Sequence, residues 1–207
     1  MLGYLKAVLT GRSFLMYEIK QMKKFLKENL SERRFIHSCN VSSESRKLAK
    51  IYGVNPDIAE FTGLVHDICK EIPNDKQYKR LEKSNMNVCQ EELSAPKVWH
   101  GIAGAQFLRD ELNIKDSDIL NAVRYHTVAR AGMSDLEKIV YLADMISEER
   151  SYTDVWQLRA ITEKSLDLGM FYALRYMLQK LLQKGCLFPK HTVEAYNEYA
   201  SKVLMEG

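Results

Sequence analysis

The chain has 207 residues, of which 46% are hydrophobic and 28% are charged, and its net charge is +3. This length supports one hydrophobic core, and the composition is typical of a folded globular protein rather than of a disordered chain. The small basic excess is spread along the sequence without interleaved aromatic residues, which disfavours nucleic acid as a partner.

The first 16 residues are apolar, but Lys6 and Arg12 interrupt them. Such a segment is too short and too mixed to span a bilayer, and it has no clear small-residue cleavage site. We therefore expect a leading helix or a loosely docked extension in residues 1–16, a single domain in residues 17–207, and no membrane partner.

Four cysteines occur without any C-x-x-C spacing, at Cys39, Cys69, Cys89 and Cys186. This pattern predicts reduced, mostly buried thiols in a cytoplasmic protein. Cys69 is close to a His-Asp pair and could act in catalysis, but packing is the more common role of such a residue.

Apolar residues recur at helical intervals along most of the chain, which contains only 4 prolines and 10 glycines. Several helix ends carry recognisable signals: an N-cap at Ser31, a stop at Gly53, a start at Asn55-Pro56 and a capping box at Ser134. The expected helices are residues 17–30, 32–53, 56–69, 96–107, 116–125, 135–146, 153–168, 169–184 and 192–204. Residues 73–93 are expected to form a loop with a short helix. The prediction is one all-α domain.

Two acidic residues stand in apolar surroundings. Asp67 follows His66 at the end of an apolar run, and Asp144 lies within the apolar run from Ile139 to Ile146. Burial of a lone carboxylate costs several kcal/mol, so each acid needs a partner. For Asp144 the sequence leaves open whether this partner is a buried arginine, a backbone group or a metal ion.

Four of the five histidines are flanked by apolar residues in the same way: His37, His66, His100 and His126. One such histidine is usually a hydrogen-bonded core residue, but four of them with two acids indicate a metal site. Imidazole and carboxylate ligands suit iron, manganese or zinc. Adjacent helical residues point about 100° apart, so His66 and Asp67 can share a metal only beside a neighbouring helix, for which the helix bearing His37 is the candidate.

The order His37, His66-Asp67, Asp144 resembles the H…HD…D signature of the HD superfamily of metal-dependent phosphohydrolases. Within that superfamily the chain is similar to the bacterial symmetrical bis(5'-nucleosyl)-tetraphosphatases, which hydrolyse diadenosine tetraphosphate to two ADP. The similarity covers residues 35–197. The segments that carry it are GLVHDICKEIP (63–73), WHGIAGAQFL (99–108), AVRYHTVARAGMSDLEKIVYLADMISEER (122–150) and LFPKHTVEAYN (187–197).

The resemblance implies a helical bundle with a buried metal site, in which iron is the expected metal and manganese or another divalent ion is the alternative. One or two ions are compatible with it. It implies four metal ligands: His37, His66, Asp67 and Asp144.

The resemblance also assigns residues to catalysis and to the substrate. Asp67 would bridge two metals or orient the attacking water, and His100 and His126 would bind phosphate, protonate the leaving ADP or hold a second metal. The implied phosphate contacts are Lys70, Thr127 and Arg150, although each charged residue of this set could instead be a solvated surface group.

Two other functions remain open. The first is another HD phosphohydrolase, acting on guanosine tetraphosphate, a deoxynucleotide or a cyclic nucleotide. Lys70-Glu71 stands where the guanosine-tetraphosphate hydrolases carry Glu-Asp, which disfavours that substrate. The second is a non-catalytic nucleotide-binding HD module, which would be expected to lack a ligand, and none is missing.

Two further features stay undecided in the sequence. One is whether the chain forms a homodimer. The other is whether four tyrosines stack on adenine or belong to the core, namely Tyr172, Tyr176, Tyr196 and Tyr199.

Overall fold

The structure is a computed structural model that describes residues 12–206, and these residues contain helices and no strand. The all-α prediction is therefore confirmed. Residues 1–11, which make up most of the predicted extension, lie outside the described part. The helices are α1 (Arg12–Asn29), α2 (Glu32–Tyr52), α3 (Pro56–Val65), α4 (Asn74–Lys83), α5 (Gln90–Leu93), the 3₁₀ helix η1 (Pro96–Val98), α6 (Trp99–Glu111), α7 (Ser117–Tyr125), α8 (Asp135–Ile146), α9 (Val155–Thr162), α10 (Leu166–Gln183) and α11 (Lys190–Glu206).

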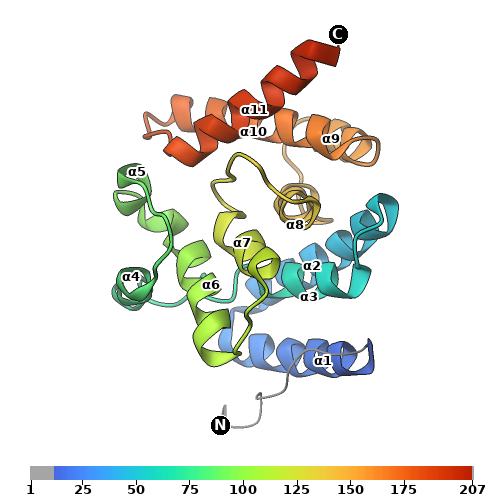
Figure 1. Ribbon diagram of the computed structural model, residues 1–207. Coiled ribbons are helices and arrows are strands. Elements are labelled where there is room, and N and C mark those ends of the chain that lie inside the picture. The colour runs from blue at the N-terminus through green and yellow to red at the C-terminus, as the bar shows by residue number, and fades with distance from the viewer. Residues whose placement is uncertain (1–11, 207) are drawn as a thin grey trace.

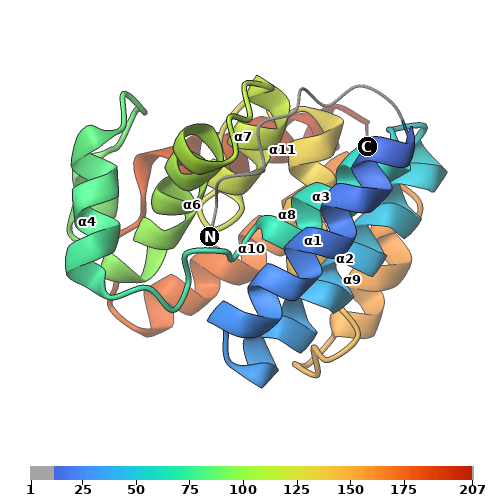
Figure 2. The ribbon, with the colours of Figure 1, turned by 90° about the horizontal axis from the view of Figure 1, so that it is seen from below.

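The helices form three levels (Figure 1). Helix α1 lies at one end and helices α10 and α11 at the other, while α2, α3, α6, α7 and α8 lie between them. Seen from below, α4 stands at the edge of the molecule beside α6 (Figure 2). The helices of the middle level are therefore covered by α1 on one side and by α10 and α11 on the other.

The predicted helix ends are largely confirmed. The Ser31 hydroxyl accepts a hydrogen bond from the Arg34 backbone N–H, and Gly53 closes α2 in the left-handed conformation with φ of 70°. Asn55 caps α3, and the reciprocal capping box begins α8. These local signals need no tertiary contact to act, which explains why the sequence displays them.

Several boundaries differ from the prediction. Helix α1 begins at Arg12 rather than at residue 17, so it includes the last residues of the predicted extension. Helix α3 ends at Val65 rather than near residue 69, because residues 66–71 form successive turns such as Lys70 N–H to Asp67 C=O (2.9 Å). Residues 73–93 contain two helices rather than one. The break before α10 is capped by Ser165, and Gly169 lies inside α10. A Cβ atom on Gly169 would lie 2.9 Å from the Thr162 hydroxyl, so this glycine permits packing and does not end a helix.

The buried apolar side chains form one cluster that reaches all three levels, as the length of the chain predicts. A close approach occurs at Gly101, where a Cβ atom would lie 2.9 Å from the Arg124 carbonyl oxygen. This glycine lets the backbones of α6 and α7 meet, and the approach brings the first turn of α6 next to the end of α7.

The cysteines are free, but the prediction that most of them are buried is wrong. Only Cys69 is buried, Cys39 and Cys89 are half-buried, and Cys186 is exposed. Burial raises the pKa of Cys69 to about 12, so its thiol stays neutral and is a poor nucleophile. Within residues 12–206, no helix is both long enough and apolar enough to cross a bilayer.

Candidate metal centre

Five segments of the middle level deliver six side chains to one place. They are His37 from the second turn of α2, His66 and Asp67 from the turn after α3, His100 from the first turn of α6, His126 at the end of α7 and Asp144 in the last turn of α8. The rings of His37, His66 and His126 form a chain of neighbours with centroid separations of 5.2 and 5.0 Å. The structure thus brings together residues that lie up to 107 positions apart. We call these six residues the metal centre.

Asp67 is the hub of the metal centre. Its Oδ1 lies 3.1 Å from His100 Nε2 and 3.4 Å from His126 Nε2, and its Oδ2 lies 3.4 Å from His66 Nε2 and 3.7 Å from His37 Nε2. The Asp67 side chain is only 3% exposed. Burial alone would raise the pKa of this carboxylate, but the imidazoles of His66, His100 and His126 keep it well below the ordinary value.

Backbone contacts orient two of the imidazoles. His66 Nδ1 lies 2.7 Å from the Gly63 carbonyl oxygen, and His126 Nδ1 lies 2.7 Å from the Val123 carbonyl oxygen. A carbonyl accepts only a proton donor, so each neutral ring carries its proton on Nδ1. The lone pair of each Nε2 therefore faces Asp67.

A carboxylate orients the third imidazole. His37 Nδ1 contacts Glu149, which also accepts hydrogen bonds from Asn40 (2.7 Å) and Ser147 (2.8 Å). These contacts lower the pKa of Glu149 to about 2, although burial acts in the opposite direction. On its other side, His37 Nε2 lies 3.1 Å from Asp144. The sequence analysis missed Glu149, because its contact with His37 spans 112 residues and depends on the loop after α8.

The pKa shifts of the histidines follow from these neighbours. Burial lowers the pKa of His37, but Asp144, Glu149 and Asp67 outweigh burial and raise it. Burial lowers the pKa of His100 to about 4, against the opposing effect of Asp67. His37 is thus protonated more readily than an ordinary histidine, whereas His100 stays neutral near pH 7.

The buried polar atoms of the centre fit a divalent metal. His66 Nε2 and Asp67 Oδ1 make no hydrogen bond with any described residue, although both are buried. Lone pairs that face one another in a buried space need a cation between them. Imidazole nitrogens and carboxylate oxygens are donors that iron, manganese and zinc accept. His37, His66 and Asp67 offer atoms within 4.8 Å of one another, as do Asp67, His100 and His126.

Three cations line the rim of the centre. Lys70 Nζ lies 3.1 Å from His100 Nε2, and Arg150 donates to the Asp144 carbonyl oxygen (2.8 Å) and pairs with its carboxylate. Arg34 Nη1 lies 2.6 Å from Asp67 Oδ2. Arg34 was missed, although its place one turn before His37 on α2 is a usable signal.

Thr127 follows His126 directly in the chain. Its buried hydroxyl makes no hydrogen bond with the described residues. This hydroxyl is therefore available as a donor, and no hydrogen bond among the described residues joins it to the metal centre.

The metal centre lies within a segment that matches a known domain. The model of the HD domain family matches residues 34–149, which is more than half of the chain. The chain belongs to the HD domain family. Its His37, His66-Asp67 and Asp144 are the residues in this HD domain that the sequence order H…HD…D indicated.

Relatives of this HD protein extend the match to most of the chain. A protein of Bacillus subtilis named symmetrical bis(5'-nucleosyl)-tetraphosphatase is 30% identical over 83% of this chain and 92% of its own length. A Staphylococcus aureus protein of the same name is 30% identical over 87% and 94%, respectively. The crystal structure of a predicted HD superfamily hydrolase involved in NAD metabolism from Clostridium acetobutylicum has a TM-score of 0.84, with 31% identity over 88% of this chain and 97% of that one. The resemblance to the HD-type tetraphosphatases is confirmed.

A second group of potential ligands lies elsewhere in the HD protein. Cys89, Glu92 and His191 offer atoms within 4.8 Å of one another, and we call them the Glu92 cluster. The buried Arg124 places Nη1 2.7 Å and Nη2 2.9 Å from the two oxygens of Glu92. The carboxylate already has a cation, and a metal ion would be repelled by the guanidinium.

Proposed function

We propose that this protein is a metal-dependent hydrolase that cleaves diadenosine tetraphosphate symmetrically to two ADP. The observation that carries the proposal is the convergence of four imidazoles and two carboxylates inside an HD domain whose relatives bear that activity in their names. The rim cations Arg34, Lys70 and Arg150 supply the positive charge that a polyphosphate requires.

In this proposal His37, His66, Asp67 and Asp144 hold the metal, with iron as the expected ion and manganese or another divalent metal as the alternative. A second ion would lie beside Asp67, His100 and His126. The metal lowers the pKa of water and neutralises phosphate oxygens.

The side chains of the chain perform the remaining tasks. Asp67 orients the attacking water through the carboxylate oxygen that does not bind the metal. His100 and His126 contact the phosphates. Lys70, whose Nζ lies 3.1 Å from His100 Nε2, supplies the proton that the neutral His100 passes to the leaving ADP. Arg150 and Thr127 hold non-bridging oxygens, and arginine can do so bidentately.

The rival HD activities are less well supported. Glu71 stands beside Lys70, and its carboxylate accepts hydrogen bonds from the Ser31 backbone N–H and hydroxyl, each 2.6 Å long. It is therefore committed to the start of α2 and does not enter the centre. A non-catalytic module is disfavoured because all six residues of the centre are present.

The proposal extends to the organisation of the protein. We assign catalysis to a single domain of residues 17–207, with a dinucleoside polyphosphate as its partner and with neither nucleic acid nor membrane involved. The four free cysteines support a reducing, cytoplasmic location. Sedimentation would decide whether the chain is a homodimer.

Product chromatography tests the activity directly. Diadenosine tetraphosphate incubated with the protein and ferrous iron should yield ADP alone, and the same protein with chelator should yield nothing. Formation of AMP and ATP would contradict symmetric cleavage. Absence of turnover with iron, manganese and zinc would reject the hydrolase, and faster cleavage of guanosine tetraphosphate or a cyclic nucleotide would favour a rival.

A further inference from the structure

A groove of about 350 Å³ lies between α9, α10 and the loop that joins α8 to α9. Its volume is within the range of small-molecule sites. We propose that this groove binds one adenosine moiety of the dinucleotide, an inference that rests on the proposed function. The groove lies outside the six residues of the metal centre.

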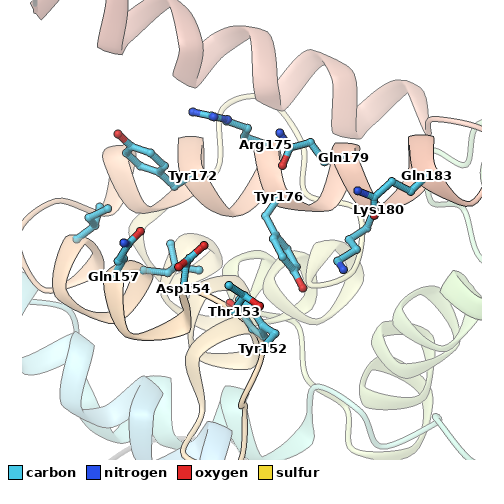
Figure 3. Close-up of a pocket in the computed structure, with 12 residues that line it drawn as sticks. Tyr152, Thr153, Asp154, Gln157, Tyr172, Arg175, Tyr176, Gln179, Lys180 and Gln183 are labelled. Carbon is cyan, nitrogen blue, oxygen red and sulfur yellow. The ribbon is translucent and has the colours of Figure 1, made fainter.

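The walls of the groove combine aromatic and amide side chains. Figure 3 shows Tyr176 and Lys180 extending from α10 toward Tyr152, with Gln157 and Tyr172 at the other end of the groove. Tyr152 and Tyr176 stack with a centroid separation of 4.7 Å. A nucleobase stacks on an aromatic ring, and a glutamine amide can donate to and accept from the edge of adenine at once.

The exposure of the tyrosines separates the groove from the core. Tyr199 is 1% exposed, and Tyr196 stacks on Phe171, so both serve packing. Tyr172 is 40% exposed and lines the groove. Tyr196 and Tyr199 therefore belong to the core. Of the four tyrosines, Tyr172 and Tyr176 remain candidates for stacking on adenine.

One loop connects the groove to the metal centre. Arg150 contacts Asp144, and Tyr152, two residues later, forms a wall of the groove and donates to the Met145 carbonyl oxygen (3.0 Å). The Cα atoms of residues two positions apart are separated by about 7 Å at most. A nucleotide whose phosphate lies at Arg150 therefore has the groove within reach of its nucleoside.

The same loop is held rigidly. Arg159 of α9 donates to the carbonyl oxygens of Ile146 (2.9 Å), Ser147 (2.9 Å) and Arg150 (3.1 Å). This arginine fixes the groove wall relative to the end of α8. The distance between a phosphate at the centre and a base in the groove is thus set by the fold.

The test compares two exposed aromatic residues on neighbouring helices. Tyr172 lines the groove, whereas Trp156 is 65% exposed and lies outside its walls. Inhibition of the iron-loaded enzyme by ADP and by pyrophosphate is measured for the wild type, Tyr172→Ala and Trp156→Ala. We expect Tyr172→Ala to raise the inhibition constant of ADP by roughly tenfold and to leave that of pyrophosphate unchanged, with no effect from Trp156→Ala.

An unchanged ADP constant in Tyr172→Ala would overturn the adenosine site, and so would an equal rise for ADP and pyrophosphate. Gln157→Ala gives a second measure, because loss of the amide should also weaken ADP alone. If the wild type does not hydrolyse the dinucleotide, the proposed function fails. Calorimetric binding of ADP to the same three proteins then decides the groove by itself.

Discussion

The metal centre and the Glu92 cluster have the same kinds of side chain at similar spacing, yet their charges are balanced differently. Glu92 receives both guanidinium nitrogens of Arg124, at 2.7 and 2.9 Å, and all of these groups are buried. Asp67 turns Oδ1 toward the rings of His100 and His126 and makes no hydrogen bond through that atom. Proximity of ligand atoms is common to both places. Arg124 pairs with both oxygens of Glu92, whereas Arg34 contacts only Oδ2 of Asp67 (2.6 Å) and leaves Oδ1 to the imidazoles.

The difference teaches how a buried carboxylate indicates its role. A carboxylate whose two oxygens both pair with one arginine stabilises a fold, whereas one that keeps an oxygen unpaired among imidazole nitrogens calls for an ion. The raised pKa of His37 agrees with this view, because the carboxylates around this ring outweigh burial and favour a positive charge there.

The largest expected effect is a difference in activity between a variant of the metal centre and a variant of the Glu92 cluster. Asp144→Ala should lose bound metal and lower turnover on the order of a thousandfold, because the metal supplies several kcal/mol to the reaction. The Glu92→Gln variant should keep the metal that is bound at the metal centre. Elemental analysis and a turnover assay measure both variants, and full metal content in Asp144→Ala would contradict the assignment.

The next effect concerns the stability that the Arg124–Glu92 pair gives to the fold. Arg124→Met leaves Glu92 buried without a cation, which should lower the free energy of unfolding by about 3–5 kcal/mol. Urea denaturation measures the loss. The double variant Arg124→Met, Glu92→Met should recover most of it, and a loss well under 1 kcal/mol in the single variant would show that the pair is not structural.

A pH series on the metal-free protein compares the same regions. The unfolded chain protonates His100 near its ordinary pKa of about 6.5, whereas the folded chain does so near 4, so stability should fall as the pH decreases from 6.5 to 4. The loss amounts to roughly 2–3 kcal/mol. Burial acts to raise the pKa of Glu92, but Arg124 outweighs it and holds this pKa below its ordinary value.

His100→Asn isolates this contribution, since the opposite effect of His37 is present in both proteins. Urea denaturation at each pH should give a flatter profile for the variant. Identical slopes for the two proteins would mean that His100 does not carry the effect.

The smallest expected effect comes from Glu149, which orients the metal-ligating ring of His37. Glu149→Ala should weaken metal affinity by about 10–100-fold, the usual result of removing a carboxylate that holds a ligating histidine. The neighbouring Glu148→Ala is the matched control, because its exposed side chain does not contact His37. Chelator competition gives the affinities, and equal values for the two variants would remove Glu149 from this role.

The sequence predicts the helices whose ends are locally encoded, and it predicts the ligands that a known signature marks. It does not predict contacts that tertiary structure creates. Gly169 resembles a helix breaker until the Thr162 hydroxyl is seen beside it. Glu92 and His191 are 99 positions apart, so their cluster has no signature in the sequence.

The contacts between Glu71 and Ser31 have a calorimetric consequence. They tie the turn that carries Asp67 to the first residues of the helix that carries His37, at two hydrogen bonds of 2.6 Å each. Two ligand-bearing segments are thus preorganised before any ion arrives. Little side-chain freedom remains to be lost on metal binding, so the entropy of metal uptake should be governed by released water rather than by ordering of the chain.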